Sequence, residues 1–225
     1  TTKVDDLTVG DDLIIGGDID LEGSIDVNGT TNLDVLDVDG AVNFAADVTF
    51  ADGADIITAS AGTSNFRAGV NAGNSIASGG NYNVTVGDEA GTALTTGDYL
   101  TALGYAAGKT VTTGVRNTYI GGLAGDAATT ADDNTAVGYA ALSAAGTGTQ
   151  NTAIGTAALN VNTDGDNNTA VGRNALLANT TADNNTAVGY QSLLANTTGA
   201  SNVAVGAYAL DANTTGTVNV AVGTA

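Results

Sequence analysis

The chain has 225 residues, of which 32 are Gly, and it contains no Pro, Cys, His, Met or Trp. Five Lys and Arg stand against 24 Asp and Glu, so the formal net charge is −19. Without Cys and His, thiolate nucleophiles, imidazole acid–base catalysis and thiolate or imidazole zinc sites are excluded. The acidic excess makes nucleic acid and an anionic membrane surface unsuitable partners.

Residues 1–60 are predicted to form an acidic β-stem. They consist of short alternating segments that end at Gly, such as Ile19-Asp20-Leu21-Glu22-Gly23, a pattern typical of half-buried strands. Residues 1–56 carry 14 acids and one Lys, a net −13 that leaves −6 for the rest. A single-chain sheet this narrow is marginal, so we expect three chains to share the stem. We interpret its acidic rows as solubilising rather than ion-binding, and expect them to be salt-sensitive: Asp18, Asp20, Asp26, Asp37 and Asp39.

Residues 61–82 are small and polar and are interpreted as a transition, with one degenerate unit beginning at Asn65. From 83 to 225 the chain repeats every 17 residues. The unit opens with Asn-Thr/Val-Ala-Val/Ile-Gly at positions 1–5 and carries an apolar pair, usually Ala-Leu, at positions 8 and 9. Positions 1, 4, 5 and 9 are clearest in five units: Asn134, Val137, Gly138, Leu142; Asn151, Ile154, Gly155, Leu159; Asn168, Val171, Gly172, Leu176; Asn185, Val188, Gly189, Leu193; Asn202, Val205, Gly206, Leu210.

A fixed period of this length predicts an all-β solenoid. The last repeat is truncated, and we expect the chain to be part of a longer protein. We expect two short strands and two turns in each coil, with Gly at position 5 closing the first strand through a positive φ or a close backbone approach. Because strand side chains alternate, position 3, usually Ala, faces away from positions 2 and 4. We interpret the Ala face as a second packed surface, and the thin core of one coil leads us to expect a homotrimer through that face.

The unit Asn-Thr-Ala-Val-Gly-Tyr-x-Ala/Ser-Leu, at 134–142 and 185–193, resembles the head repeats of trimeric autotransporter adhesins. It is more similar still to the longer-period version in bacteriophage tail fibres, and residues 7–44 are similar to the stems that precede such arrays. The resemblance implies a trimeric left-handed parallel β-roll behind a β-stem, in an extended fibre that adheres to a surface.

Several motifs suggest chemistry but are better explained as structure. Asp164 and Asp166 could offer oxygen ligands to Ca²⁺, although turns favour the same residues. Asp88-Glu89 could form a catalytic carboxylate pair, but adjacent strand residues point to opposite faces. The run from Gly104 to Lys109-Thr110 has one residue too few for a phosphate loop. We therefore expect no enzyme activity, no metal and no cofactor.

Two rows of side chains could form binding surfaces. Tyr105, Tyr139 and Tyr190 recur at position 6, where they either cover the coil edge or stack on sugars. Thr recurs at positions 13 and 14, in pairs such as Thr180-Thr181, which leaves an ice-binding solenoid as an alternative.

The sequence thus favours a structural and adhesive fibre segment, first a phage tail fibre that mediates host attachment and second a bacterial adhesin head. Its expected location is extracellular, on a virion or a bacterial cell surface. Its expected partners are two further copies, a cell-surface receptor or glycan, and other fibre or virion proteins, with no nucleic acid and no membrane.

Overall fold

The computed structural model describes residues 61–144 and 146–224, and the predicted stem lies outside them. Every described strand has three residues and begins at position 2 of a unit. The ten strands are β1 Phe66–Ala68, β2 Val84–Val86, β3 Thr101–Leu103, β4 Thr118–Ile120, β5 Thr135–Val137, β6 Thr152–Ile154, β7 Thr169–Val171, β8 Thr186–Val188, β9 Val203–Val205 and β10 Val220–Val222. No helix occurs in these two ranges.

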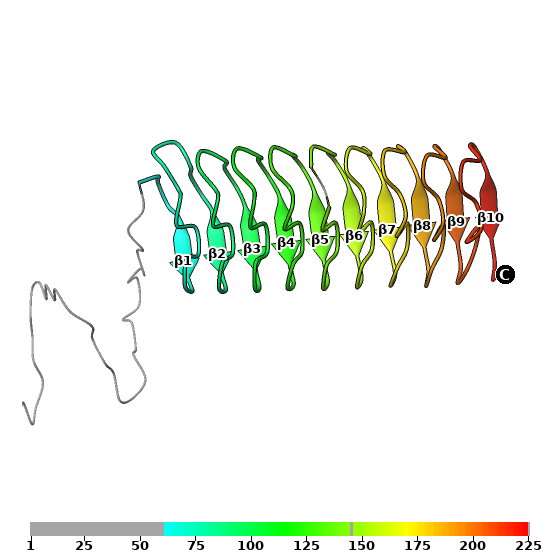
Figure 1. The fold of residues 1–225 in the computed structure, drawn as a ribbon, viewed down its shortest axis with the longest axis horizontal. Coiled ribbons are helices and arrows are strands. Elements are labelled where there is room, and N and C mark those ends of the chain that lie inside the picture. The colour runs from blue at the N-terminus through cyan, green and yellow to red at the C-terminus, as the bar shows by residue number, and fades with distance from the viewer. Residues whose placement is uncertain (1–60, 145, 225) are drawn as a thin grey trace, which may run out of the picture. The chain divides into compact units, whose positions relative to one another are not determined.

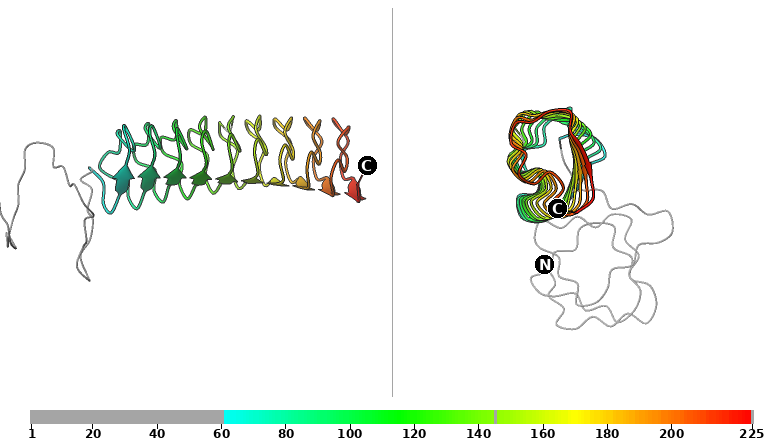
Figure 2. Two further views of the ribbon diagram at one scale, coloured as in Figure 1. Left: turned by 90° about the horizontal axis from the view of Figure 1, so that it is seen from below. Right: turned by 90° about the vertical axis from the view of Figure 1, so that its right-hand side faces the viewer.

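The strands form one parallel sheet in chain order, from β1 to β10 (Figure 1). Each pairs with the next in register, so Thr152 lies beside Thr169 and Ile154 beside Val171. One coil of chain separates successive strands, and the end-on view shows the coils nearly superimposed (Figure 2). The prediction of an all-β solenoid is confirmed, and nine steps of about 4.8 Å give a stack of roughly 43 Å.

Each coil contains one strand rather than the two expected. The apolar segment at positions 8 and 9 cannot extend as a strand, because positions 7 and 9 have left-handed backbone, as at Ala157 (φ 54°) and Leu159 (φ 49°). Position 17 is also left-handed, as at Asn167 (φ 57°). The chain therefore curls tightly after the strand and turns again before the next unit.

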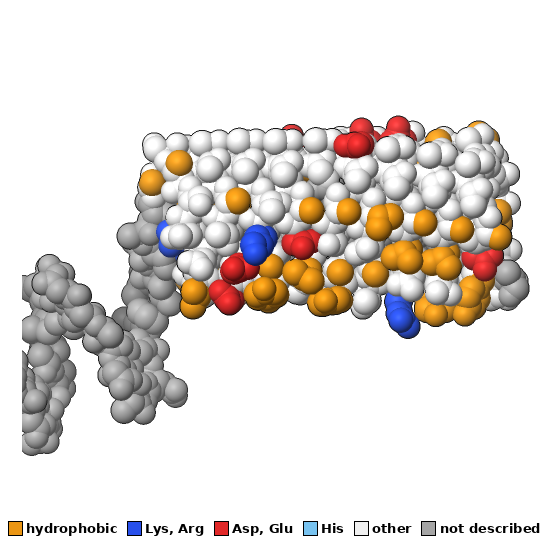
Figure 3. Space-filling model, viewed as in Figure 1, with side chains coloured by type: hydrophobic (Ala, Val, Ile, Leu, Met, Phe, Trp, Pro, Cys, Tyr) orange, Lys and Arg blue, Asp and Glu red, His pale blue; other side chains and the backbone are white. Residues whose placement is uncertain are grey.

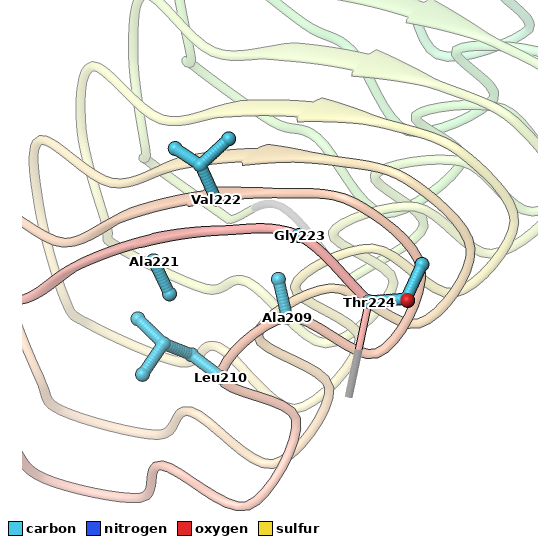
Figure 4. Close-up of a pocket in the computed structure, with 6 residues that line it drawn as sticks. All are labelled: Ala209, Leu210, Ala221, Val222, Gly223 and Thr224. Atoms are coloured by element: carbon cyan, nitrogen blue, oxygen red, sulfur yellow. The ribbon is translucent and has the colours of Figure 1, made fainter.

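Alanine at position 3 faces the inside of the coil, which corrects the expectation that it forms an association surface. Six of these residues are fully buried within their own chain: Ala102, Ala136, Ala153, Ala170, Ala187 and Ala204. In the last coil Ala221 points toward the interior beside Ala209 and Leu210, whereas Val222 points the opposite way (Figure 4). The coil is narrow, so only a small side chain fits opposite the Leu of position 9, and the larger residues of positions 2 and 4 lie outside.

Glycine at position 5 is required for two reasons, a positive φ and a close approach of the next coil, and both were predicted. Gly155 has φ 129°, a conformation that other residues avoid. A Cβ added there would also lie 2.7 Å from the carbonyl carbon and oxygen of Gly172 in the next coil. The position-5 glycines thus form a column in which successive backbones touch.

Asparagine at position 1 is buried and connects the coils through its side chain. The amide oxygen of Asn151 accepts from the backbone N–H of Asn168 (2.9 Å), and its amide nitrogen donates to the carbonyl of Gly165 (2.8 Å). The bond to the next coil repeats from Asn65 to Asn219 except at Leu100, which has no amide to offer to Asn117. This amide ladder satisfies backbone groups that the narrow interior hides from water.

The core is filled in two ways along the stack. The four units that begin at residues 65, 83, 100 and 117 have Gly at position 9 and an apolar residue at position 12: Ile76, Leu94, Val111 and Ala128. The units that begin at 151, 168, 185 and 202 have Leu at position 9 and Asn at position 12, and these Asn form a second amide ladder: Asn162, Asn179, Asn196 and Asn213. Position 12 thus supplies the apolar volume that Gly at position 9 lacks.

Tyr119 stands where other units have Ala and fills space over two of the position-9 glycines. Its ring lies where a Cβ on Gly108 or Gly125 would be, and its side chain is fully buried. The hydroxyl lies near Asn134 without a well-formed hydrogen bond, and burial outweighs that amide and raises the pKa of this phenol. Tyr119 belongs to the unit that begins at residue 117, the last of the four units with Gly at position 9, which we call glycine-type units.

The segment expected to be a transition contributes a complete coil. Asn65 begins a unit of 18 residues whose strand β1 pairs with β2. Ile76 keeps its place at position 12, and Gly80 corresponds to Gly97 of the next unit, so the additional residue lies between them. The extra length is accommodated in the turn at positions 13 and 14.

Candidate functional site

The outer surface of the sheet, which we call the strand face, consists of the side chains at positions 2 and 4 of β2 to β9. Position 4 places a row of aliphatic residues there, of which Leu103 is 45% exposed and Ile154 40%. Position 2 places a row of half-buried Thr beside it: Thr101, Thr118, Thr135, Thr152, Thr169 and Thr186. None of these six hydroxyls makes a hydrogen bond to another described residue. The strand face is therefore a flat band without a partner in its own described chain.

The Tyr row of position 6 lies just past the position-5 glycines, at the margin of the strand face. Tyr105, Tyr139 and Tyr190 are 56, 60 and 38% exposed, so none of them forms part of the core. A Cβ at Gly122 would be 3.6 Å from Tyr139, so this ring lies over the glycine of the preceding unit. On the face drawn in Figure 3 apolar side chains gather toward one edge, with several charged side chains among them.

Threonine at position 13 has a structural role. The hydroxyl of Thr180 donates to the carbonyl of Thr197 (3.2 Å), and that of Thr197 to the carbonyl of Thr214 (3.0 Å). The same bond occurs in other units, beginning at Thr95 (2.9 Å). These donors belong to the ladder between coils, so this row offers ice fewer free hydroxyls than the sequence suggested.

The two calcium candidates both accept hydrogen bonds from the preceding coil. Asp164 accepts from the hydroxyl of Thr147 (2.7 Å), and Asp166 accepts from the backbone N–H (2.6 Å) and hydroxyl (3.0 Å) of Thr149. Asp98, Asp132 and Asp183, also at position 16, accept backbone N–H groups in the same way. In the described ranges no three acidic side chains gather as metal ligands. Aspartate at position 16 thus extends the bonding between coils.

The remaining candidates for chemistry are the Asp88-Glu89 pair and the phosphate-loop-like run that contains Lys109. Glu89 forms an ion pair with Lys109 at 2.6 Å, which raises the pKa of Lys109 through a hydrogen bond and charge attraction. The cation of the phosphate-loop-like run is therefore held by a carboxylate. Asp88 is exposed, whereas Glu89 is half-buried and paired with Lys109.

Sequence reasoning did not identify the amide ladders or the surface position of the Thr and Val rows. The signal for the ladder was available, because an identical Asn at position 1 of nearly every unit is more specific than turn chemistry requires. It also missed Arg173 and Tyr208, which extend the Tyr row near its C-terminal end.

Comparison of the chain with protein-family models, with curated proteins and with solved structures found no match. Across the described ranges no helix is long and apolar enough to cross a membrane.

Proposed function

We propose that the chain is a segment of an extended homotrimeric attachment fibre, first a phage tail fibre and alternatively the head of a bacterial trimeric adhesin. The observation that carries the proposal is the strand face, an aliphatic and Thr band that follows the stack from β2 to β9. Three left-handed rolls would each bury this band against the other two around a common axis. The role is structural and adhesive, without catalysis or a cofactor.

The energetics support burial of this face. Each coil encloses one large apolar side chain, such as Leu159 or Leu176, together with a few Ala. Ordering a residue costs about 1 to 2 kcal/mol, and burying a Val or Ile contributes roughly 1.5 to 3 kcal/mol. One position-4 side chain per coil, packed against two other chains, adds a second core of similar size. The proposed interface is thus formed by positions 2 and 4, and the Ala row lies inside each roll.

In this role the fibre lies outside the cell, on a virion or a bacterial surface, with a cell-surface receptor or glycan as target and other fibre or virion proteins as neighbours. Three parallel copies strengthen weak contacts by multivalency.

Sedimentation equilibrium of the 225-residue chain tests the proposal, with an expected mass of three chains of 21.8 kDa. Val171→Lys places a charge on the strand face and should yield smaller species. Thr181→Lys, on the exposed turn of the same unit, is the matched control and should remain trimeric. A wild-type chain that sediments as a folded monomer contradicts the trimer.

A further inference from the structure

Three exposed side chains on consecutive coils form a cluster at the C-terminal end of the Tyr row. Arg173 and Tyr190 occupy position 6, and Tyr208 occupies position 7 of the next unit. The guanidinium carbon of Arg173 lies 6.0 Å from the centroid of the Tyr190 ring. The rings of Tyr190 and Tyr208 are 5.2 Å apart at 88°, and 38 and 40% of the two residues are exposed. The two perpendicular rings form a corner with a cation at one side.

Arg173 differs from the other described cations. Lys109 and Arg116 are held by Glu89 and Asp133, and Arg67 donates to the carbonyl of Ala72 (2.9 Å). Arg173 makes no ion pair or hydrogen bond with any described side chain. A cation–π contact orients a guanidinium but leaves its five N–H donors available. An exposed, oriented and unneutralised cation is unusual on a surface whose described residues carry a net −6.

The adjoining groups are suited to a sugar. Gln191 follows Tyr190, and its backbone N–H donates to the carbonyl of Arg173 (3.0 Å), which ties the two consecutive coils together at this point. Partial desolvation and then the neighbouring Tyr190 raise the pKa of the Tyr208 phenol. Phenols are protonated at neutral pH in any case, so this hydroxyl can donate a hydrogen bond there. Asp211, the acid nearest in sequence to Tyr208, belongs to the same unit as Tyr208, two coils from that of Arg173. Asp166, the acid nearest in sequence to Arg173, accepts hydrogen bonds from Thr149.

We propose that Arg173, Tyr190 and Tyr208 form a subsite for a carboxylated sugar residue of a surface polysaccharide. The guanidinium pairs with the carboxylate through two parallel N–H donors, and the apolar face of the sugar ring packs in the corner of the two phenols. A coil step of about 4.8 Å matches the width of one pyranose ring. This inference rests on the proposed attachment role and specifies the chemistry of the target.

The test titrates the full-length chain with an alginate hexamer, an oligomer of carboxylated sugars, and with maltohexaose as the uncharged counterpart, at low salt by NMR chemical-shift perturbation. We expect the alginate hexamer to bind at least about tenfold more tightly than maltohexaose. Arg173→Gln should weaken alginate binding by about tenfold, and Tyr190→Ala should also reduce it. Arg116→Gln removes a cation from position 17 and should change alginate binding less than about twofold.

Equal binding of the two hexamers, or an equal effect of Arg173→Gln and Arg116→Gln, would overturn the subsite. Circular dichroism of each variant confirms that the fold is intact, and Arg173→Lys keeps the charge while removing the planar fork. The attachment role is assessed separately by adhesion of the wild-type trimer to bacterial cells. Adhesion that persists in Arg173→Gln rejects the subsite and keeps the role, whereas alginate binding without adhesion to cells keeps the subsite and rejects the role.

Discussion

At the scale of single residues, the same position can require different chemistry in different coils. Position 9 is left-handed throughout, with φ 56° at Gly91 and 49° at Leu159. Leu in this conformation costs roughly 1 to 2 kcal/mol, which its burial offsets by about 1.5 to 3 kcal/mol. Gly avoids the backbone cost but leaves the core to be filled by Leu100, Val111 and Tyr119. Position 5 has no such alternative, because a side chain there would collide with the next coil.

We therefore predict that Gly155→Ala lowers the free energy of unfolding by about 2 to 4 kcal/mol, through an unfavourable φ and a Cβ 2.7 Å from Gly172. Gly122→Ala is the matched control, because a Cβ there meets only ordinary contacts, the nearest at 3.6 Å. Thermal unfolding followed by circular dichroism should separate the two variants. Similar melting of both would show that the glycine column is not under this constraint.

The amide ladder gives a second prediction at this scale. Asn168→Ala removes the acceptor of the Asn185 N–H, which is left unpaired, and one of two donors to the Ala182 carbonyl, which keeps its bond from Asn179. We expect a loss of about 1.5 to 4 kcal/mol in chemical denaturation. Thr181→Ala, an exposed turn residue of the same unit, should cost less than about 0.5 kcal/mol. A loss as small in Asn168→Ala would mean that water replaces the amide.

At the scale of the coil, the period of 17 predicted the solenoid and the strand that ends at the Gly of position 5, but not which strand face is inside. Alternation places Ala136 opposite Thr135 and Val137 without choosing between the two faces. The choice follows from interior width, which depends on how tightly the left-handed residues curl the chain. The left-handed conformations occur at Ala140, Leu142 and Gln150. These residue types rarely adopt a positive φ, so the sequence does not predict it there.

The two modes of core filling predict coupling between positions 9 and 12. Leu176→Gly should destabilise the array by about 2 to 4 kcal/mol, because the cavity outweighs the relieved backbone. Asn179→Leu alone breaks bonds of the second amide ladder, but together with Leu176→Gly it recreates the glycine-type coil. In a double-mutant cycle the pair should therefore cost about 1 kcal/mol less than the sum of the two single substitutions. Pairing Leu176→Gly with Thr181→Ala should instead be additive. Additivity in the first pair would indicate that position 12 does not fill the space left at position 9.

At the scale of the whole molecule, the array is held by repeated backbone contacts and very few charges. Its two described ion pairs, Lys109–Glu89 and Arg116–Asp133, are on the surface. Arg116 lowers the pKa of Asp133, so any stabilisation by that pair is present above the unfolded carboxyl pKa and is lost at more acidic pH. Glu89 raises the pKa of Lys109, so on the alkaline side the contribution of that pair is lost as the pH rises through the raised pKa.

Between about pH 5 and 9 the melting of the array should therefore be nearly constant, since the chain has no His or Cys to titrate there. Thermal scans followed at the Tyr circular-dichroism bands check this, because all seven Tyr lie at or beyond residue 82. Arg116→Gln should leave the plateau flat and reduce the acid-side slope. A midpoint that moves by more than a few degrees within the plateau would reveal an ionisable contact in the assembled molecule.

The 18-residue coil has a consequence for how such a molecule can vary. Its additional residue lies between Ile76 and Gly80 and leaves the pairing of β1 with β2 intact. Duplication of a 17-residue unit lengthens the rod by about 4.8 Å, whereas growth of this turn adds material only at the flank. A tripeptide inserted after Thr181 should leave the melting temperature nearly unchanged, and the same insertion after Val171 should unfold the array. The length of the stack and the size of the turns on its flank can thus be changed independently, which makes the array suited to engineered peptide display.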